Sequence, residues 1–547
     1  MKEVFAALFC LLIPALVLIP PLSKGEGRLT VRLGSFRYEW AVFAVLVIGF
    51  AARLIALGKY PAGFNQDEAS AAYDAYSILK TGYDRNGQFL PVHLIAWGSG
   101  QNALYSYLSM PFLAVFGLDV WAFRLPMALV GCLSLFAFWR LLLVMTERKT
   151  ALAGLALLAV CPWHIMKSRW ALESNLFPDL ILFASFFLVI GLQRDRLPPF
   201  LAGCGMLGLS SYAYGTSYLF LPVFVLPLLV FLIRKQKLSL RRAGAGLGVL
   251  LAVALPMVLF VLVNTFGLET IRLPFMTIPR LPANRMAAMA SVFSPDFLRD
   301  SIGNFAEASK IAVMQTDGLI WNAMEGFGIA YGFSLPFTVI GFLRCLMGER
   351  EERPAWGCVM NAWFLAALVL VLVVKPNINR INALWIPWLY YTALGAAWIA
   401  QSRPVFRTAV AGLYAAAFLV FEAQYLTGYQ EKMAAAFEDS FGEAVVYAAG
   451  TGADTVYVTD RVNGAYALTL FYTAEDPEVF RETAKITNPG AMFEQVSAFG
   501  RYRIAATPAS LPEGTAAVVR NDTADEPRYD GYEKIRFGRF TVLENLE

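Results

Sequence analysis

The sequence carries little charge for its length. Of its 547 residues, 16% are Asp, Glu, Lys or Arg, whereas 58% are hydrophobic, and the mean hydropathy is +0.54. A soluble domain of this length needs far more charge to cover its surface, which excludes a water-soluble enzyme. The apolar residues form runs of about 20, the length of a helix that crosses a bilayer. We therefore expect an α-helical polytopic membrane protein.

Histidine and cysteine are also scarce. The chain has two His and six Cys, and no pair of Cys has CxxC spacing. The long segments expected outside the membrane contain no Cys, which argues against an exterior built on disulfides. The formal net charge of +4 gives no reason to expect nucleic-acid binding. No glycine-rich nucleotide loop occurs, so we expect no nucleotide cofactor.

The apolar runs predict about 12 transmembrane helices. The predicted spans are residues 5–22, 40–57, 119–145, 150–166, 174–192, 199–216, 217–233, 243–264, 326–345, 355–374, 380–400 and 405–422. A further apolar run, 102–117, is short and aromatic at both ends, and we expect it to lie at the membrane surface.

Basic residues cluster in alternate loops, as in "TERKT" and "RKQKLSLRRAG". Cytoplasmic loops carry the excess of Lys and Arg, so these loops are predicted to be cytoplasmic. Residues 58–118, a long first outer loop, and residues 423–547 are then extracytoplasmic. We expect an integral protein of the bacterial plasma membrane.

The chain changes character after residue 422. Residues 423–547 are polar and contain short strand patterns such as "DTVYVTD" and "EKIRFGRFTVLE", together with helix patterns such as "PEVFRETA". We predict a membrane domain over 1–422 and a small extracytoplasmic α/β domain over 423–547.

The first outer loop contains the acidic stretch "GFNQDEASAAYDAYSILKTGYDRNGQFLP", starting at Gly63. Asn65 and Glu68 have the spacing of a capping box at a helix start. An apolar face then follows, formed by Ala71, Ala72, Ala75, Ile78 and Leu79, and Thr81-Gly82 ends the helix. Capping explains Glu68, but it leaves the second carboxylate, Asp67, without a clear structural reason.

The same stretch resembles the first outer loop of GT-C glycosyltransferases, in particular the protein O-mannosyltransferase and lipid A aminoarabinose transferase group. The matching motifs are Asp67-Glu68, the run Gly82-Tyr83-Asp84-Arg85-Asn86-Gly87 with Pro91, and then Tyr107, Pro111, Phe116-Gly117 and Arg124-Leu125-Pro126. The similarity covers roughly residues 40–400. It implies a GT-C fold and the transfer of a sugar from a polyprenyl-phosphate donor to an extracytoplasmic acceptor, which is a cell-envelope glycan, lipid or protein.

The resemblance also implies roles for individual residues. Asp67 would be the general base that takes a proton from the acceptor hydroxyl, and Glu68 would orient it or help bind a divalent metal ion. The leaving lipid phosphate needs cationic partners. Candidate ligands of substrate and phosphate are Asp84 and Arg124 from the motifs, Arg380 where relatives carry a basic residue, Lys375 beside it, and Arg169 from its outer position. His164 is a candidate metal ligand, although a hydrogen-bonded structural histidine is the commoner case.

Two departures from the family pattern affect these roles. Many relatives carry Lys-Pro-Pro in the first loop, where this chain has Gly100-Gln101-Asn102. Relatives often place an Asp after the fourth span, where the nearest polar residues here are Glu173 and Asn175. A secondary transporter or lipid flippase is the alternative class, and a non-catalytic GT-C-like protein is a third reading.

Overall fold

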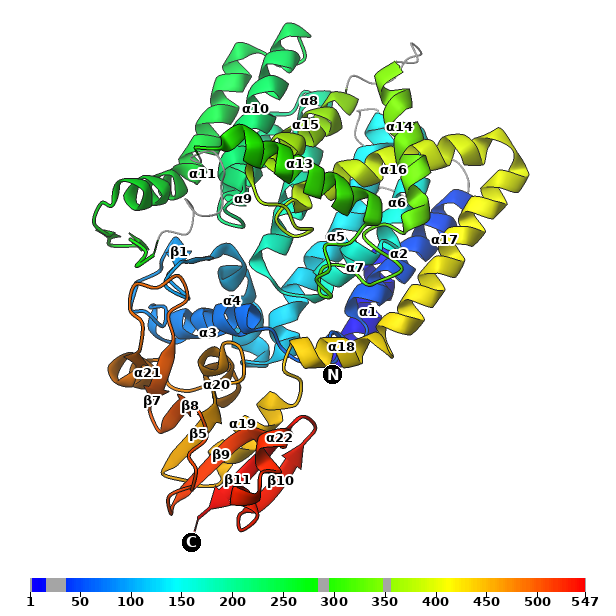
Figure 1. Ribbon diagram of the computed structural model, residues 1–547. Helices are drawn as coiled ribbons and strands as arrows, with labels where there is room; N and C mark the ends of the chain where they lie inside the picture. The colour runs from blue at the N-terminus through cyan, green and yellow to red at the C-terminus, as the bar shows by residue number, and fades with distance from the viewer. Residues whose placement is uncertain (1, 16–35, 284–294, 348–355, 547) are drawn as a thin grey trace.

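The computed structural model describes residues 2–15, 36–283, 295–347 and 356–546. Part of the first predicted span, residues 16–22, therefore lies outside the described residues. Most of the chain up to residue 425 is helical, as expected for a polytopic membrane protein. The helical part lies at one end of the molecule and a sheet of C-terminal strands at the other (Figure 1).

The apolar helices follow the predicted runs closely. They are α1 (Lys2–Ala15), α2 (Phe36–Leu54), α5 (Val120–Met145), α6 (Arg148–Ala159), α7 (Pro162–Arg169), α8 (Phe177–Gln193), α9 (Leu197–Ser210), α10 (Ser217–Arg234), α11 (Leu240–Phe266), α14 (Leu335–Met347), α15 (Gly357–Val373), α16 (Trp385–Ser402) and α17 (Pro404–Tyr425). Helix α13 (Phe297–Met314) lies outside every predicted span.

Fewer helices than expected are long enough to cross a bilayer alone. Within the described residues five helices meet that length and apolarity, and a sixth span results if α6 and α7, bent by 52°, are taken together. Several other apolar helices are too short on their own, including α9 and α15. Multi-helix membrane proteins tolerate bent and short segments where other helices cover the backbone. The count of about 12 spans stays a prediction.

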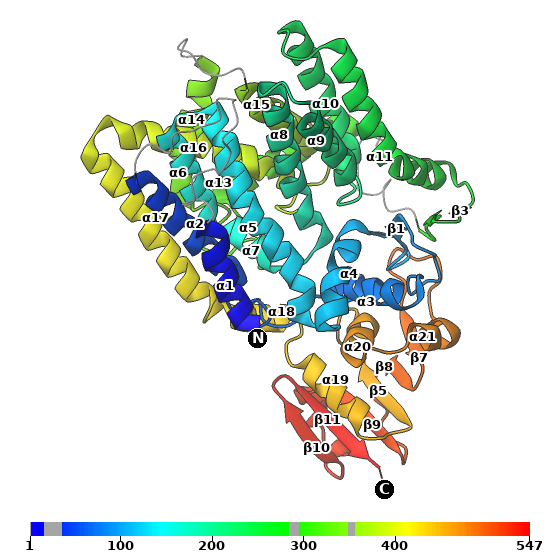
Figure 2. The same ribbon diagram turned by 180° about the vertical axis from the view of Figure 1, so that it is seen from behind.

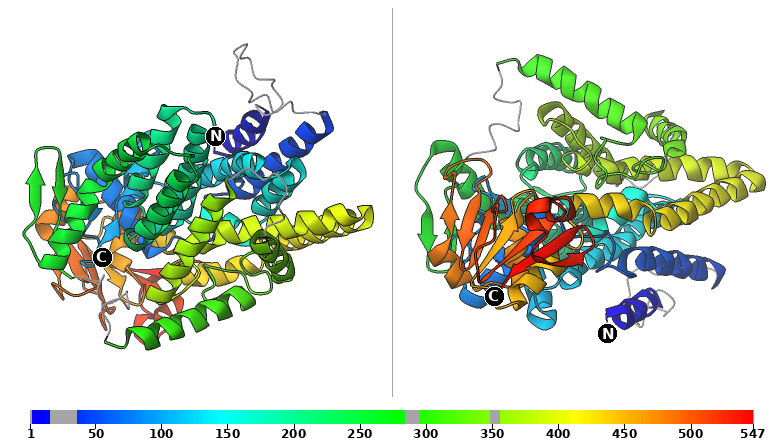
Figure 3. Two further views of the ribbon diagram at one scale, coloured as in Figure 1. Left: turned by 90° about the horizontal axis from the view of Figure 1, so that it is seen from above. Right: turned by 60° about the horizontal axis from the view of Figure 1, so that its bottom comes forward.

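Close packing between these helices depends on glycine at particular crossings. A Cβ atom added to Gly341 of α14 would lie 1.9 Å from the carbonyl oxygen of Tyr391, and one on Gly395 of α16 would lie 1.9 Å from that of Phe337. Small residues allow membrane helices to approach this closely. By contrast α17 extends to the edge of the molecule in both views of Figure 3, and its side chains are largely exposed.

The first outer loop forms a layer of its own. It contains α3 (Gln66–Thr81), the short strands β1 (His93–Leu94) and β2 (Gln101–Asn102), and α4 (Leu104–Phe116). This layer lies between the membrane helices and the C-terminal strands in both Figure 1 and Figure 2. The hairpin of β3 (Ile271–Leu273) and β4 (Met276–Ile278) reaches it, because the amide of Val92 donates to the carbonyl of Thr277. Helix α4 has 13 residues, too few to span a bilayer.

The capping box predicted at the start of α3 is confirmed. The Asn65 side chain accepts from a helix amide and Glu68 accepts from the amide of Asn65. Gly82 ends the helix with a φ of +79°, the left-handed conformation that glycine adopts without strain. The predicted apolar face is buried except at Leu79, which is 39% exposed.

The C-terminal unit, defined here as residues 429–546, is built around a mixed seven-stranded sheet with the order β10-β11-β9-β5-β8-β7-β6. Its strands are β5 (Thr455–Thr459), β6 (Lys485–Ile486), β7 (Val496–Phe499), β8 (Tyr502–Ala505), β9 (Thr515–Arg520), β10 (Glu533–Phe537) and β11 (Phe540–Asn545). Its helices are α18 (Tyr429–Ala436), α19 (Phe441–Gly450), α20 (Ala465–Thr473), α21 (Pro477–Thr483) and α22 (Asn521–Ala524). The α/β character expected from the sequence is therefore present. Its placement outside the membrane as a separate domain remains a prediction.

Candidate active site

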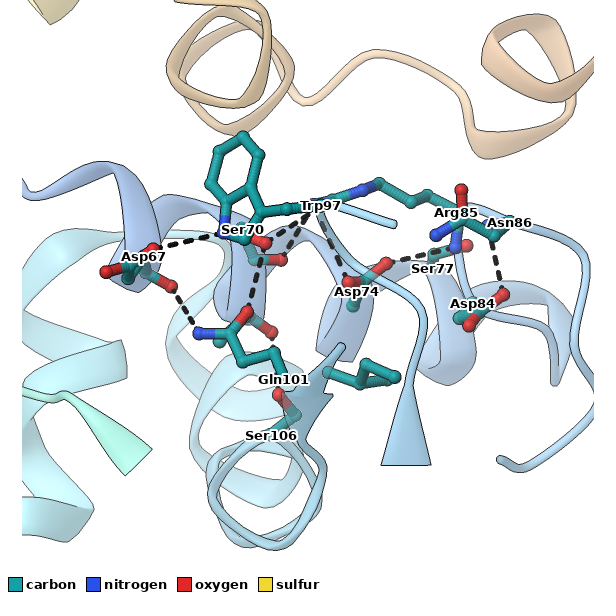
Figure 4. A network of polar contacts seen from close by, with 12 residues as sticks. Asp67, Ser70, Asp74, Ser77, Asp84, Arg85, Asn86, Trp97, Gln101 and Ser106 are labelled. Carbon is teal, nitrogen blue, oxygen red and sulfur yellow. Dashed lines mark hydrogen bonds and ion pairs between the residues drawn. The ribbon is translucent and has the colours of Figure 1, made fainter. Parts of the chain in front are cut away.

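Asp67 lies in the first turn of α3 and is half-buried. The indole N–H of Trp97 donates to its Oδ1 over 3.0 Å (Figure 4). The side-chain amide of Gln101 donates to the main-chain oxygen of Asp67 over 3.0 Å. Helix N-termini favour negative charge, so both the helix and the indole stabilise the ionised carboxylate.

Glu173 comes to the same place from another segment. It begins the short helix η1 (Glu173–Leu176) and is half-buried. The amide nitrogen of Gln101 that contacts Asp67 also lies 3.2 Å from Glu173 Oε2. The described structure thus gathers two half-buried acidic residues around one glutamine amide.

The loop Lys375–Arg380, which carries two cationic side chains, packs against η1. The Ser174 hydroxyl donates to Asn379 over 2.8 Å, and the Asn382 side chain donates to the Ser174 carbonyl over 2.8 Å. Within that loop the guanidinium of Arg380 contacts the carbonyl of Lys375, and the Lys375 side chain is exposed. Both predicted phosphate ligands therefore belong to a loop that is fixed beside Glu173.

Glu68 and Arg124 form a buried ion pair, with the side chains of both fully buried. The Arg124 guanidinium donates twice to Glu68 over 2.9 Å and also to the carbonyls of Pro61 and Gly63. Glu68 accepts a further bond from the amide of Ala171. These contacts use the groups that a phosphate or a metal would need, so the geometry favours a structural role for the pair over the roles expected from the motif.

Arg169 is also turned inward. Its guanidinium donates to the carbonyls of Ala52, Ile55, Ala56 and Tyr60, and the residue is 1% exposed. Cationic side chains commonly satisfy the last carbonyls of a helix. Arg169 thus ends α2 and the turn after it, a geometry that does not favour phosphate binding.

Asp84 lies in a tight turn after α3. Its carboxylate accepts from the amides of Asn86 and Gln88 over 2.9 and 2.8 Å, and the residue is fully buried. Burial, and next the charge of Asp74, raise the pKa of Asp84 to about 7. Asp74 pairs with Arg85 over 3.5 Å. Asp84 therefore fixes the turn of the motif and does not face the space around Asp67 (Figure 4).

Comparison with known proteins agrees with the resemblance. A family model described as dolichyl-phosphate-mannose-protein mannosyltransferase matches residues 102–262. The chain is similar to ArnT from Cupriavidus metallidurans bound to undecaprenyl phosphate, with a TM-score of 0.50, 15% identity, and coverage of 93% of this chain and 97% of ArnT. The chain has the fold of the GT-C glycosyltransferases.

A second solved structure with this fold is the oligosaccharyltransferase of Archaeoglobus fulgidus in complex with Zn and sulfate. The TM-score is 0.53 at 11% identity, and the match covers 79% of this chain and 61% of the archaeal one. This chain thus spans less than two thirds of that enzyme. Comparison with curated proteins gives no match.

The metal site expected from the sequence does not fit the residues around Asp67. No group of three or more His, Cys, Asp or Glu side chains that could hold a metal occurs in the described parts of the chain. His164 is buried between Arg53, 2.8 Å from its Nδ1, and Asp179, 3.3 Å from its Nε2. Lys167 also pairs with Asp179. Glu68 is saturated by Arg124, so neither predicted metal ligand is available.

A groove of about 380 Å³ runs between α10 and α11 of the GT-C bundle. Its walls are aliphatic, and the hydroxyls of Ser217 and Tyr218, which have no hydrogen-bond partner among the described residues, lie where α10 begins. This end adjoins the outer layer, since the amide of Leu104 in α4 donates to the carbonyl of Tyr212. The groove therefore leads from the bilayer region toward the segment that carries Gln101.

Sequence reasoning named Asp67, Arg380 and Lys375, and it noted Glu173 and the Gln101 substitution. It missed Trp97, whose indole contacts Asp67. A tryptophan in an apolar loop gives no sign of its partner, so only the fold brings it into the site.

Proposed function

We propose that this protein is an integral membrane glycosyltransferase that moves a sugar from a polyprenyl-phosphate donor to an acceptor on the extracytoplasmic side, with Asp67 as general base. The observation that carries the proposal is the convergence of Asp67, Gln101 and Glu173 beside the Lys375–Arg380 loop within a GT-C fold. A half-buried carboxylate and a nearby cationic loop are the two groups that transfer from a lipid phosphate requires.

The proposed step is a displacement at the anomeric carbon of the donor sugar. The acceptor hydroxyl oxygen forms a bond to this carbon while the bond from the carbon to the phosphate oxygen breaks. The electron pair of the broken bond stays on the phosphate, and the hydroxyl proton passes to Asp67. The charge on the departing phosphate is matched by Arg380 and Lys375. The energy comes from the activated donor bond, so the step needs no nucleotide.

The prenyl chain of the donor is proposed to lie in the groove between α10 and α11. Aliphatic walls suit a hydrocarbon chain, and the polar end at Ser217 and Tyr218 adjoins α4. Related enzymes support this donor class, since the ArnT structure contains undecaprenyl phosphate. We also propose that the outer layer and the C-terminal unit lie on the extracytoplasmic side, because the basic loops are at the opposite helix ends.

The test uses purified protein in detergent or nanodiscs with a polyprenyl-phosphate-linked sugar. Acceptor-dependent release of free polyprenyl phosphate is expected from the wild type. Asp67→Asn should lower this release about a hundredfold or more, the range typical for loss of a general base. Normal release by a folded Asp67→Asn protein would remove Asp67 as the base.

The same preparation separates the proposal from the flippase alternative. A flippase would move the intact lipid-linked sugar across a vesicle bilayer without breaking the sugar–phosphate bond. Transbilayer movement with no release, given every acceptor class, would contradict the transferase proposal.

A further inference from the structure

Trp97 connects the proposed base with the C-terminal unit. Its indole N–H donates to Asp67 over 3.0 Å, and the residue is only 7% exposed. The ring is fixed from the opposite side, because Tyr466 of α20 meets it edge to face at 5.5 Å. Arg85 lies over both rings, at 5.5 Å from Trp97 and 5.6 Å from Tyr466.

The main chain around Trp97 is held by the same unit. The amide of Glu494 donates to the Trp97 carbonyl over 2.8 Å, and Gly98 forms a β-bridge with Phe493. Gly98 has a φ of +90°, and a Cβ added there would lie 2.7 Å from Cγ of Glu494. The segment after β6 thus makes a main-chain contact with the loop that carries the indole.

A second contact reaches the start of α3 directly. Gly464, in the turn before α20, has a φ of +66°, and a Cβ there would lie 2.5 Å from Cβ of Gln66 and 3.1 Å from the Trp97 ring. Gln66 immediately precedes Asp67 in the chain. The turn at Gly464 therefore packs against both the helix start and the indole, which limits the movement of each.

A fixed N–H donor changes what a carboxylate can do. It favours the ionised form, so Asp67 is ready to accept a proton, and it restricts the rotation of the carboxylate. A donor on a freely rotating side chain would lose part of this effect, since correct orientation must then be reached at each turnover. The contacts with Tyr466, Arg85 and Glu494 remove that freedom.

We propose that Trp97 is a positioning residue for Asp67 and that the C-terminal unit, through Tyr466 and the Glu494 main chain, holds Trp97 in place. The C-terminal unit is then a working part of the transfer site, not an appended module. This inference rests on the proposed function, since it takes Asp67 as the base.

The direct test is Trp97→Phe, which keeps an aromatic ring and removes the N–H donor. We expect kcat to fall roughly tenfold, because the carboxylate of Asp67 loses its fixed orientation, with donor KM within about twofold. The acidic limb of the kcat–pH profile should move to higher pH, because loss of a donor raises the pKa of the base. A purely structural role would lower the folded fraction and leave the limb unchanged.

The charges of the other titratable groups around this contact must stay the same in the variant. Glu173 shares the Gln101 amide with Asp67, and Arg85 and Tyr466 contact the indole of Trp97. The main chain of Glu494 binds the Trp97 carbonyl, and Glu68, which follows Asp67 in α3, is paired with Arg124. Trp97→Phe changes none of these charges, so a moved limb reports on Asp67.

A variant in the C-terminal unit provides independent evidence. Tyr466→Leu should reduce kcat severalfold and move the acidic limb in the same direction, because it removes the aromatic contact that holds Trp97. Tyr447→Leu is the matched control, because Tyr447 is an exposed aromatic residue of the same unit whose ring packs at a tilt against Phe537. The control should leave both quantities unchanged.

A double-mutant cycle separates this inference from the proposed function. If Asp67→Asn retains normal transfer, the proposed function fails, whatever Trp97 does. If Asp67→Asn is inactive while folded Trp97→Phe and Tyr466→Leu have wild-type kcat and pH profile, only this inference fails. In the Asp67→Asn background, residual activity should not fall further with Trp97→Phe, and an additional tenfold loss would overturn the inference.

Discussion

Helix α3 and the turn after it carry two groups of acidic residues, and the two groups are built differently (Figure 4). At the start of the helix, Asp67 is half-buried, and Gln101 connects it to Glu173. Asp74 in the middle of the helix and Asp84 in the turn are fully buried around Arg85. A buried, paired charge fixes a conformation, whereas a carboxylate that reaches the surface can meet a substrate. The same segment thus contains both structural carboxylates and a candidate catalytic carboxylate.

The same contrast separates two neighbours in the sequence. Glu68 points into the protein and is saturated by Arg124 and main-chain amides, whereas Asp67 points toward Trp97. Adjacent helix positions differ by about 100° around the axis, so an acidic pair cannot place both carboxylates on one face. This explains why an acidic pair can contribute one structural and one catalytic carboxylate.

Breaking the buried Glu68–Arg124 pair should have the largest effect on the stability of the protein. Arg124→Met leaves Glu68 buried without its partner, and removing one member of a buried pair typically costs about 3–5 kcal/mol. We expect the free energy of unfolding of the detergent-solubilised protein to fall by about that amount. Arg461→Ala, which breaks an exposed pair with Asp522, is the control and should cost about 1 kcal/mol or less. A stable Arg124→Met protein with impaired donor use would instead place Arg124 at the phosphate.

Removal of the Arg380 guanidinium should affect transfer and leave stability nearly unchanged. Arg380→Ala removes a charged partner of the lipid phosphate, which typically costs about 1.5–3 kcal/mol, or roughly ten- to a hundredfold in kcat/KM for the donor. Steady-state kinetics over a range of donor concentrations measure this effect. Unchanged kinetics would take Arg380 out of the site.

A smaller effect is expected at the other end of α3, in the pH dependence of stability. Because the pKa of Asp84 in the folded protein is about 7 and lies above its unfolded value, the folded state binds more protons between about pH 4 and 7. Stability should therefore decrease as pH rises from about 4 to 7 and change little above that. Asp84→Asn should remove a pH-dependent difference of roughly 2–3 kcal/mol between pH 5 and pH 8. Thermal unfolding at pH 5 and pH 8 tests this, and equal pH dependence in both proteins would contradict it.

Local patterns predicted much of the fold. The capping box at Asn65 and the strand pattern over 533–544 depend on neighbouring residues, and both are present, the latter as β10 and β11. The stretch "EKMAAAFEDSFGEAVVYAA", residues 431–449, has a helix pattern throughout, but it is divided into α18 and α19, with Glu438 and Ser440 at positive φ between them. Helix α20 was missed because its residues, "AYALTLFYT", are nearly all buried and show no polar face.

The site was harder to predict than the fold. The outer position of Arg124 and Arg169 made them reasonable phosphate ligands, but topology does not tell which way a guanidinium points. Both donate to buried acceptors. The contacts among Asp67, Trp97 and Glu173 join three segments far apart in the chain. No spacing rule could have assembled them, and only the family resemblance indicated Asp67 in advance.

The most direct test of the account compares Asp67→Asn with Asp74→Asn in parallel preparations. Each is assayed for sugar transfer from a lipid-linked donor, per folded molecule, and for thermal unfolding. We predict that Asp67→Asn unfolds like the wild type and loses about a hundredfold or more in transfer. Asp74→Asn should be less stable by about 1–3 kcal/mol, because Arg85 loses its partner, and should retain transfer within a few fold. A stable Asp67→Asn protein with normal transfer would contradict the account.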